Sequence, residues 1–312
     1  MKKALISVSL IALLLVAGCL GEGKSGTDTV KAEVLVDPAW VQSHLDDPGV
    51  RIIDLSSSPA VYENGHIKGA VYVDWRSDIA DPEQVDRYNI APREQIEALL
   101  GRLGVDEDTT IVLYDNLDNR LSTRTYWTLK VYGHEDVRIL DGGRRAWEAA
   151  GGEYTAEAPE ITATDYRAKG VNSEIKTDMG FILDNLDNPD VVLIDGRPSE
   201  MYTGEKAGVV FNTKAEHKRR GHIPGALNIP WKENLNEDGT FKSPEELKSL
   251  YESHGVTPDK TVVTYCNEGL HASPPWFVLS ELLGYPDVRL YDDSMAEWAN
   301  RDDTPMNTGP DP

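Results

Sequence analysis

The segment Thr261-Val-Val-Thr-Tyr-Cys266-Asn267 matches an earlier part of the chain at four of its seven positions. Its counterpart lies 151 positions before it and reads Thr110-Ile-Val-Leu-Tyr-Asp115-Asn116. Both segments begin with five apolar, β-branched or aromatic residues, a composition typical of a buried strand. The sequence therefore predicts two copies of one folding unit, and in each copy a polar or reactive residue follows the strand directly.

Three further repeats surround this pair in the same order along the chain. The matched ranges are 37–54 with 178–195, 65–70 with 221–226, and 133–147 with 284–298. The first two pairs are offset by 141 and 156 positions, and the third is again offset by 151. Ordered repeats of this kind indicate an internal duplication. The changes in offset mark insertions, the largest of which covers residues 204–220.

Each copy alternates short apolar strands with helical patterns. In the second copy, residues 191–194 and 261–265 have the pattern of buried strands. Residues 274–283 have a helical pattern, with Ser273 as the expected N-cap and Pro274 in the first turn. Strands that alternate with helices predict an α/β fold, in which each copy forms a mainly parallel sheet with helices on both faces.

The composition limits the possible partners. The chain has 312 residues, of which 40% are hydrophobic and 27% charged, as in soluble globular proteins. Its formal net charge is −22, which argues against binding to nucleic acid or to an anionic lipid surface by charge alone.

The N-terminus has the pattern of a secretion signal. Lys2 and Lys3 precede an apolar run from Ala4 to Val16, which is short for a membrane span but typical of a signal peptide. The run ends in Val16-Ala-Gly-Cys19, which resembles the lipobox of prokaryotic lipoproteins, where the cysteine is acylated. An ordinary signal peptide with an incidental cysteine is the alternative.

These patterns divide the chain into five predicted segments. They are a lipoprotein signal peptide at 1–18, a tether at 19–30, a non-catalytic copy at 31–151, a linker at 152–171 and a catalytic copy at 172–312. The expected location is the cell envelope, with the protein lipid-anchored on the outer side of the cytoplasmic membrane or in the periplasm.

Cys266 is the candidate nucleophile. The chain has two cysteines, and if Cys19 carries lipid, Cys266 has no partner for a disulfide. Cys266 ends a strand at the sheet edge where α/β proteins bind ligands. The loop 267–272, which contains Gly269, can direct backbone N–H groups inward as an anion nest, and we expect this nest to lower the pKa of the thiol. The alternative is an inert, buried cysteine.

The first copy serves as an internal comparison. Asp115 occupies the position of Cys266 and cannot carry out sulfur chemistry. One copy thus retains a nucleophile and the other has none. We therefore expect the first copy to be structural.

Several motifs resemble the two-domain rhodanese family between about Val34 and Asp303. These motifs are Asp195-Gly-Arg197, Gly221-His-Ile-Pro-Gly-Ala226, Cys266-x-x-Gly269 followed by Trp276, and Tyr291-Asp-Asp-Ser-x-x-Glu-Trp298. The resemblance implies a sulfurtransferase that moves sulfane sulfur from a donor of the thiosulfate or 3-mercaptopyruvate class to cyanide or a thiol. Cys266 would carry the sulfur as a persulfide, and the resemblance implies no metal and no organic cofactor.

The resemblance also indicates which residues bind the substrate. They are Asn267, Glu268, Gly269, Leu270, His271 and Ala272 of the loop, together with Arg197. Arg197 has an alternative role, since an arginine directly after a buried strand often pairs with a carboxylate. His271 occurs only in the second copy and is the candidate for tuning the thiolate.

The loop departs from the family in its charge. Many bacterial members have arginines at its second and sixth positions, where this chain has Asn267 and His271. Thiosulfate-specific members have a lysine near Glu268 and an arginine at the position of Met201. We therefore expect weak binding of a dianionic donor. The basic run 214–220 either supplies substitute cations or forms a solvated loop.

Two functions other than sulfur transfer also use a loop of this kind. A phosphatase with a related loop needs an arginine six residues after the cysteine, where this chain has Ala272. The alternative retained is a catalytically degenerate rhodanese-like module that binds a thiol or a partner protein.

Overall fold

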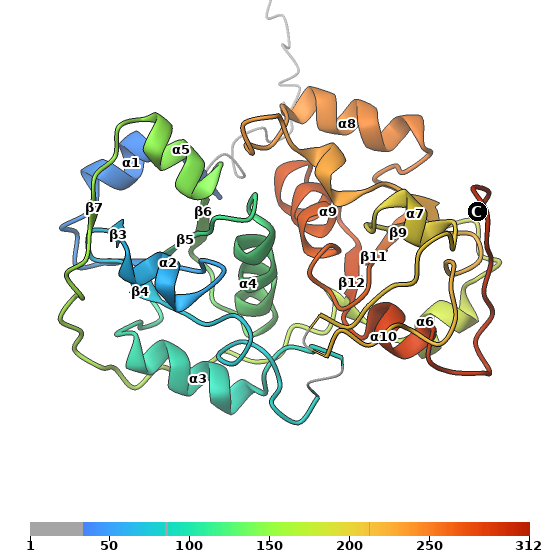
Figure 1. The fold of residues 1–312 in the computed structure, drawn as a ribbon, viewed down its shortest axis with the longest axis horizontal. Helices are drawn as coiled ribbons and strands as arrows, with labels where there is room; N and C mark the ends of the chain where they lie inside the picture. Colours follow the sequence, from blue (N-terminus) through green and yellow to red (C-terminus); the bar gives the residue numbers. More distant parts are fainter. Residues whose placement is uncertain (1–33, 85–86, 212) are drawn as a thin grey trace, which may run out of the picture. The chain divides into compact units, whose positions relative to one another are not determined.

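The computed structural model describes residues 34–84, 87–211 and 213–312, and these contain two five-stranded parallel sheets (Figure 1). The predicted signal peptide, the tether and Cys19 lie outside the described residues. Among the residues described, no helix combines the length and the apolar character needed to cross a membrane.

The first copy alternates strands and helices, as the sequence predicts. Its elements are β1 (Leu35–Val36), α1 (Pro38–Ser43), β2 (Val50–Asp54), α2 (Pro59–Glu63), β3 (His66–Ile67), β4 (Val71–Tyr72), α3 (Arg93–Arg102), β5 (Thr110–Tyr114), α4 (Arg120–Val131), β6 (Val137–Leu140), α5 (Gly143–Ala149) and β7 (Tyr154–Thr155). The sheet has the order β1-β6-β5-β2-β4, and all its pairs are parallel. A separate antiparallel pair joins β3 to β7, so the beginning of the predicted linker packs with the first copy.

The second copy repeats this arrangement. Its elements are β8 (Lys176–Thr177), α6 (Met179–Asp184), β9 (Val191–Asp195), α7 (Ser199–Tyr202), β10 (Leu227–Asn228), the 3₁₀ helix η1 (Trp231–Asn234), α8 (Pro244–Ser253), β11 (Thr261–Tyr265), α9 (Ser273–Phe277), the π-helix η2 (Val278–Leu282), β12 (Val288–Tyr291) and α10 (Ser294–Trp298). The order β8-β12-β11-β9-β10 is that of the first sheet, and again all pairs are parallel.

The pairing register of the strands is the same in the two copies. Val50 pairs with Thr110 in the first sheet, and the equivalent residues Val191 and Thr261 pair in the second. The other equivalent pairs are Leu35–Ile139 with Lys176–Leu290 and Ile111–Val137 with Val262–Val288. A slip of one residue would turn every side chain of a strand to the opposite face. The shared register confirms the duplication read from the sequence.

The helix after Cys266 differs from the predicted one. Ser273 does not cap it: Ser273 is the first residue of α9, and its buried hydroxyl donates to the carbonyl of Gly269 at 2.8 Å. The helix also changes type after Phe277, where α9 gives way to η2. There the Leu283 N–H bonds to the carbonyl of Val278, five residues back, as in a π-helix. The serine cap was therefore wrong, whereas the predicted helix is present as α9 followed directly by η2.

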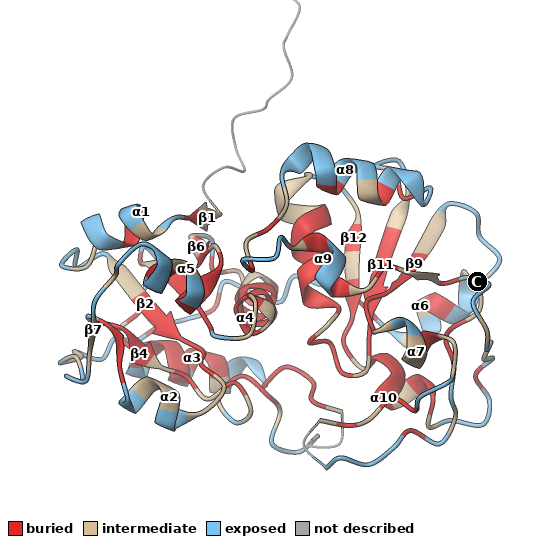
Figure 2. Cartoon of the chain, turned by 45° about the horizontal axis from the view of Figure 1, so that its top comes forward, coloured by how far each residue is buried: buried red, intermediate tan, exposed pale blue. Residues whose placement is uncertain are grey.

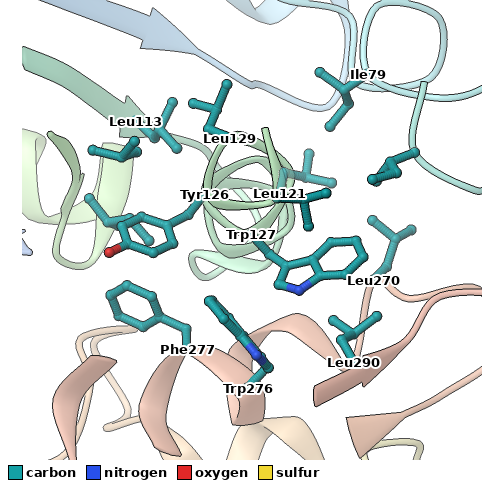
Figure 3. Close-up of a cluster of buried hydrophobic side chains, with 14 of the residues drawn as sticks. Ile79, Leu113, Leu121, Tyr126, Trp127, Leu129, Leu270, Trp276, Phe277 and Leu290 are labelled. Carbon is teal, nitrogen blue, oxygen red and sulfur yellow. The ribbon is translucent and has the colours of Figure 1, made fainter. Parts of the chain in front are cut away.

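Helix α4 lies between the two copies and is buried on nearly all sides (Figure 2). One side packs on β5 and β6 of its own sheet, and another packs on α9 of the second copy. Tyr126 and Trp127 point from α4 toward Phe277 and Trp276 (Figure 3). The Tyr126 and Phe277 rings meet edge to face with their centroids 4.9 Å apart. These two residues lie 151 positions apart, so equivalent positions of the two copies contact each other.

Two equivalent aspartates, Asp292 buried and Asp141 partly buried, join the copies through backbone hydrogen bonds. Asp141, which follows β6, accepts from the N–H of Phe241 at 3.0 Å. Asp292, which follows β12, accepts from the N–H of Ile90 at 3.1 Å. Asp292 lies 151 positions after Asp141, and Phe241 lies 151 positions after Ile90. The two bonds are therefore equivalent, and each copy binds the other in the same way.

Asp292 also forms the most deeply buried ion pair between the copies. Its carboxylate lies 2.6 Å from Nη2 of Arg124 in α4, and the side chains of both residues are at most 1% exposed. The same Nη2 donates to the carbonyl of Tyr88 at 3.0 Å, and Lys176 lies 3.5 Å from the carboxylate. A buried charge needs such partners, because transfer from water costs several kcal/mol per ion.

We predict that Arg124→Met destabilises the protein by about 3–5 kcal/mol, because it leaves the Asp292 carboxylate buried without its guanidinium partner. The matched control is Arg102→Met, in which the arginine is 62% exposed and pairs with Asp78 at the surface. That change should cost less than about 1 kcal/mol. Denaturant unfolding of both variants measures the difference, and equal costs would show that the buried pair has no special role.

Candidate active site

Cys266 lies directly after β11, at the carboxyl edge of the second sheet. Its backbone is held on both sides by the start of α10. The Cys266 N–H donates to Oγ of Ser294 at 3.1 Å, and the Cys266 carbonyl accepts from the N–H of Met295 at 3.0 Å. The residue is only 1% exposed. The sulfur is thus fixed at the ligand-binding edge and covered by other residues.

The loop after Cys266 turns backbone N–H groups toward the sulfur, as predicted. The N–H of Glu268 lies 3.4 Å from Sγ, and that of His271 lies 3.2 Å from it. Gly269 makes the turn possible, since its φ of +84° is in the left-handed region that favours glycine. A Cβ atom at Gly269 would also collide with the guanidinium of Arg124.

The predicted lowering of the thiol pKa was wrong. Burial raises the pKa of Cys266 above its ordinary value. The N–H groups of Glu268, His271 and Ala272 act in the opposite direction, and the charge of Glu268 adds to the rise. The sequence showed the N–H donors, but the loss of water around the sulfur outweighs them.

The equivalent loop of the first copy holds a carboxylate. Asp115 accepts from the N–H groups of Leu117 at 2.7 Å and Asn119 at 3.1 Å. Its second oxygen accepts from the N–H of Ser122 at 2.7 Å and from the Ser122 hydroxyl at 2.8 Å. Asp115 is buried, so these donors take the place of water. A loop of this shape can therefore hold an anion where the second copy has Cys266.

Glu268 is buried beside the sulfur and is only 2% exposed. Its Oε1 accepts from the N–H of Phe211 in the insertion, while Oε2 has no hydrogen-bond partner among the residues that the structure describes. Burial raises the pKa of Glu268 to about 7, although the Phe211 N–H, Lys214 and Arg124 favour its ionised form. Its charge therefore changes near neutral pH, which the sequence did not indicate.

The insertion 204–220 packs over the active loop. Its two arms are joined by a bond of 2.9 Å from the His217 N–H to the Gly208 carbonyl. A side chain at Gly208 would overlap the Asn267 amide, so the insertion backbone approaches the loop closely. Phe211 reaches across to the first copy, where its ring centroid lies 5.1 Å from that of Trp75. The insertion thus lies against Asn267 and Glu268, the two residues that follow the cysteine.

The basic run 214–220 within the insertion has a mixed role. Lys214 lies with its Nζ 3.8 Å from the centroid of the Phe211 ring and acts on the buried Glu268. Arg219 instead donates to the carbonyls of Trp298 at 2.7 Å and Thr304 at 2.6 Å. One cation therefore reaches the edge of the site, while another holds the chain after α10.

The other loop residues divide between the site and the core. Asn267 turns its side chain toward Met201, with Nδ2 3.6 Å from the Sδ atom of Met201. Its Oδ1 has no hydrogen-bond partner among the described residues. Leu270 and Ala272 are buried in the hydrophobic core, where Leu270 lies near Trp127 (Figure 3). Both were predicted to bind substrate, which stays a prediction: their side chains pack in the interior, while the backbone N–H of Ala272 acts on the Cys266 thiol.

His271 is held as a neutral ring. Its Nε2 lies 3.0 Å from Nη1 of Arg120, and its ring is stacked on Trp231 with centroids 5.5 Å apart. Burial, together with the charges of Arg120, Arg197 and Lys232, lowers the pKa of His271 to about 3. His271 thus affects Cys266 through its backbone N–H and not through a charge on its ring.

Arg197 has the structural role that the sequence left open, which is to pair with a carboxylate. Its Nη2 and Nε contact both oxygens of Asp195 at 2.6 to 3.1 Å, and Nη2 also donates to the Gly221 carbonyl at 2.8 Å. Arg197 is 1% exposed. In the first copy the equivalent Asp54 pairs with Arg144 at 2.9 Å. Each copy thus neutralises this aspartate, but with an arginine from a different element.

The sequence reasoning missed Arg120. This residue opens α4 in the first copy, yet its guanidinium reaches the active loop of the second copy and interacts with Cys266. A signal was available, because Arg120 lies 151 positions before His271 and is therefore its equivalent. Equivalent residues meet when two copies pack in the same way on each other. The first copy is thus more than a scaffold.

We predict that Glu268→Gln removes a pH dependence of stability. The Glu268 carboxyl ionises near pH 4.5 in the unfolded chain but near pH 7 in the folded protein. Between these two pH values the folded protein therefore binds more protons than the unfolded chain. Stability then falls as the pH rises through the window. The variant keeps an acceptor for Phe211, and near pH 8 it should be more stable than wild type by about 1–3 kcal/mol.

Denaturant unfolding at about pH 4, 6 and 8 tests this, since the two proteins should be nearly equal at the lowest pH. The control is Glu245→Gln at an exposed position of α8. If Glu268→Gln and the control depended on pH in the same way, the buried carboxyl would not be the cause.

Comparison with known proteins agrees with this arrangement. The sequence profile of the rhodanese-like domain matches residues 37–150 and 180–301. The sulfur carrier protein TtuD of Thermus thermophilus is 40% identical over 280 residues, which are 89% of this chain and 97% of that protein. The structure of the 3-mercaptopyruvate sulfotransferase SseA of Escherichia coli matches with a TM-score of 0.74 and 30% identity over 84% of this chain and 98% of SseA.

A structure of EanB with a cysteine persulfide also matches, with a TM-score of 0.78 and 25% identity over 89% of this chain and 71% of EanB. The profile covers most of the chain, and the full-length relative shares well over a third of its residues. The chain therefore belongs to the rhodanese-like sulfurtransferase family and contains two rhodanese-like domains.

Proposed function

We propose that Cys266 carries sulfur as a persulfide and passes it from a small sulfane donor to a thiophilic acceptor. The observation that carries this proposal is the loop geometry, with two N–H groups directed at Sγ. The equivalent loop holds the Asp115 carboxylate with the same kind of donors. Such a nest has the donors for the anionic terminal sulfur of a persulfide. The persulfide in EanB supports the proposal by analogy.

The reaction has two displacement steps. With thiosulfate, the Cys266 thiolate attacks the outer sulfur, an S–S bond to Cys266 forms, and the bond to the sulfonyl sulfur breaks to release sulfite. The terminal sulfur keeps the negative charge. An acceptor such as cyanide or a thiolate then attacks this sulfur, and the bond to Cys266 breaks to regenerate the thiolate. No electrons are gained or lost overall, so neither step needs a redox partner.

Access to the sulfur requires movement of the covering residues. Cys266 is 1% exposed, and the insertion is held to the loop through Glu268 and Phe211. A donor therefore reaches Sγ when this contact opens. Opening also admits water, which favours the thiolate that burial disfavours.

The charge around Cys266 favours some donors over others. Glu268 is partly ionised near neutral pH and lies beside the sulfur. Its charge repels a dianion such as thiosulfate more strongly than a monoanion such as 3-mercaptopyruvate. We therefore expect thiosulfate to be the poorer donor.

The alternative function is a degenerate module that binds a thiol or a partner protein. The raised pKa of Cys266 and the covered sulfur are the observations that favour it. The two functions differ in one respect that can be measured, which is whether Cys266 gains a sulfur atom.

We predict that Cys266 gains the mass of one sulfur atom when the protein is incubated with thiosulfate or 3-mercaptopyruvate, and that cyanide removes it. The experiment uses a Cys19→Ser protein, in which Cys266 is the only cysteine. Intact mass measurement follows each step, and Cys266→Ser is the control. Full sulfurtransferase activity in Cys266→Ser would refute the assignment, and a wild-type protein that never gains mass would favour the binding module.

We also propose that Cys19 is lipid-modified and anchors the protein to the outer side of the cytoplasmic membrane or within the periplasm. The support is the N-terminal sequence, in which two lysines, an apolar run and Val16-Ala-Gly-Cys19 follow one another. Residues 20–30 would connect the anchor to the first rhodanese-like domain.

We predict that the native protein sediments with membranes and that its mature form begins at an acylated Cys19. Cys19→Ser should release the protein into the soluble fraction or leave its signal peptide attached. Fractionation and mass spectrometry of the N-terminal peptide test this. A soluble wild-type protein with an unmodified Cys19 would contradict it.

A further inference from the structure

The active loop lacks the arginines found in many family members, so its anions need another source of positive charge. Two cations in the described part of the chain interact with Cys266, namely Arg197 and Arg120. Arg197 is fully buried and bound to both oxygens of Asp195. Its charge is therefore largely neutralised by its own partner. Arg120 is the remaining candidate.

Arg120 is bound to the loop through His271. A guanidinium can only donate hydrogen bonds, so the 3.0 Å contact makes Nε2 of His271 the acceptor. The proton of the neutral ring then resides on Nδ1. Trp231 stacks on the His271 ring and also lies 5.5 Å below the Arg120 guanidinium. Arg120 and Trp231 together fix the residue whose backbone N–H points at Sγ at 3.2 Å.

The surroundings of Arg120 leave part of its charge available. Burial lowers its pKa, while Asp115, Cys266 and Asp118 raise it, and an arginine remains charged in either case. Asp115 is already surrounded by backbone donors from its own loop. The Nε–H of Arg120 is buried and has no hydrogen-bond partner among the described residues. It is a spare donor close to the active loop.

We propose that Arg120 is a positioning residue of the Cys266 site, contributed by the domain that has no nucleophile. It holds His271 and supplies the positive charge that the loop has lost, and it thereby favours the thiolate, the persulfide and an anionic donor. The part that concerns the donor rests on the proposed sulfur transfer. The active site is then shared between the two domains.

The test compares Arg120→Gln and Arg120→Met with Arg120→Lys, all in the Cys19→Ser protein. Gln keeps a donor for His271 without the charge, Met removes both, and Lys keeps the charge. The control is Arg102→Met in the same domain, where the arginine is 62% exposed and pairs with Asp78. Circular dichroism and cooperative unfolding establish which variants are folded, and one folded neutral variant is sufficient.

The first readout is the rate at which iodoacetamide alkylates Cys266 as a function of pH, which needs no sulfurtransferase activity. Loss of a nearby cation disfavours the thiolate. Near pH 7 the neutral variants should react about three- to tenfold more slowly, and their pH profile should move to higher pH. Lys should restore most of the rate, and the control should behave like wild type.

The second readout is steady-state kinetics with thiosulfate and 3-mercaptopyruvate. The neutral variants should raise KM about three- to tenfold, more for the dianion than for the monoanion, with a smaller change in kcat. An unchanged pH profile together with an unchanged KM in a folded neutral variant would overturn the proposal. An Arg120→Lys variant that is as impaired as the neutral variants would also overturn the proposal. If wild type never forms a persulfide but alkylation still depends on Arg120, the proposed function fails while the effect of Arg120 on the thiolate stands.

Discussion

The packing of the two domains against each other depends on two equivalent aspartates that accept hydrogen bonds across the interface. Asp141 and Asp292 each end the same strand of their own sheet, and each accepts a backbone N–H from the other domain. Asp292 also holds Arg124 in the buried helix α4. With α4 fixed in this way, its first residue, Arg120, lies against the loop after Cys266. The geometry of the candidate site thus follows from the interface and not from the second domain alone.

The two equivalent loops, after Asp115 and after Cys266, direct backbone N–H groups at different side chains. The Asp115 carboxylate gathers four donors at 2.7 to 3.1 Å. The larger sulfur of Cys266 has two N–H groups, at 3.2 and 3.4 Å. Burial nevertheless dominates in both loops, since it raises the pKa of Asp115 as well as that of the Cys266 thiol. A persulfide, whose terminal sulfur extends further, would meet other parts of the loop.

Much of the fold could be predicted from the sequence because the duplication is encoded locally. The offsets between repeats predict that the two copies share one arrangement of strands, and the structure gives both copies the same registers. The strand pattern also predicts that Cys266 lies at the ligand-binding edge. The pKa direction could not be predicted, since it depends on how deeply the folded chain buries the sulfur. The neutral state of His271 and the proximity of Arg120 depend likewise on contacts between residues far apart in sequence. Ser273 failed as a cap because the helix already begins at Ser273, whose hydroxyl donates back to the carbonyl of Gly269.

Contacts between equivalent residues have a further consequence. Arg120 touches His271 and Tyr126 touches Phe277, and in both cases the partners occupy the same position of the repeat. In a homodimer, residues on the two-fold axis meet their own copies in this manner. The chain thus has the architecture of a fused homodimer in which the two halves have since become unequal. In a symmetric ancestor both sides of such an axial contact would carry one and the same residue. Fusion allowed the pair to become an arginine and a histidine, which no homodimer can achieve.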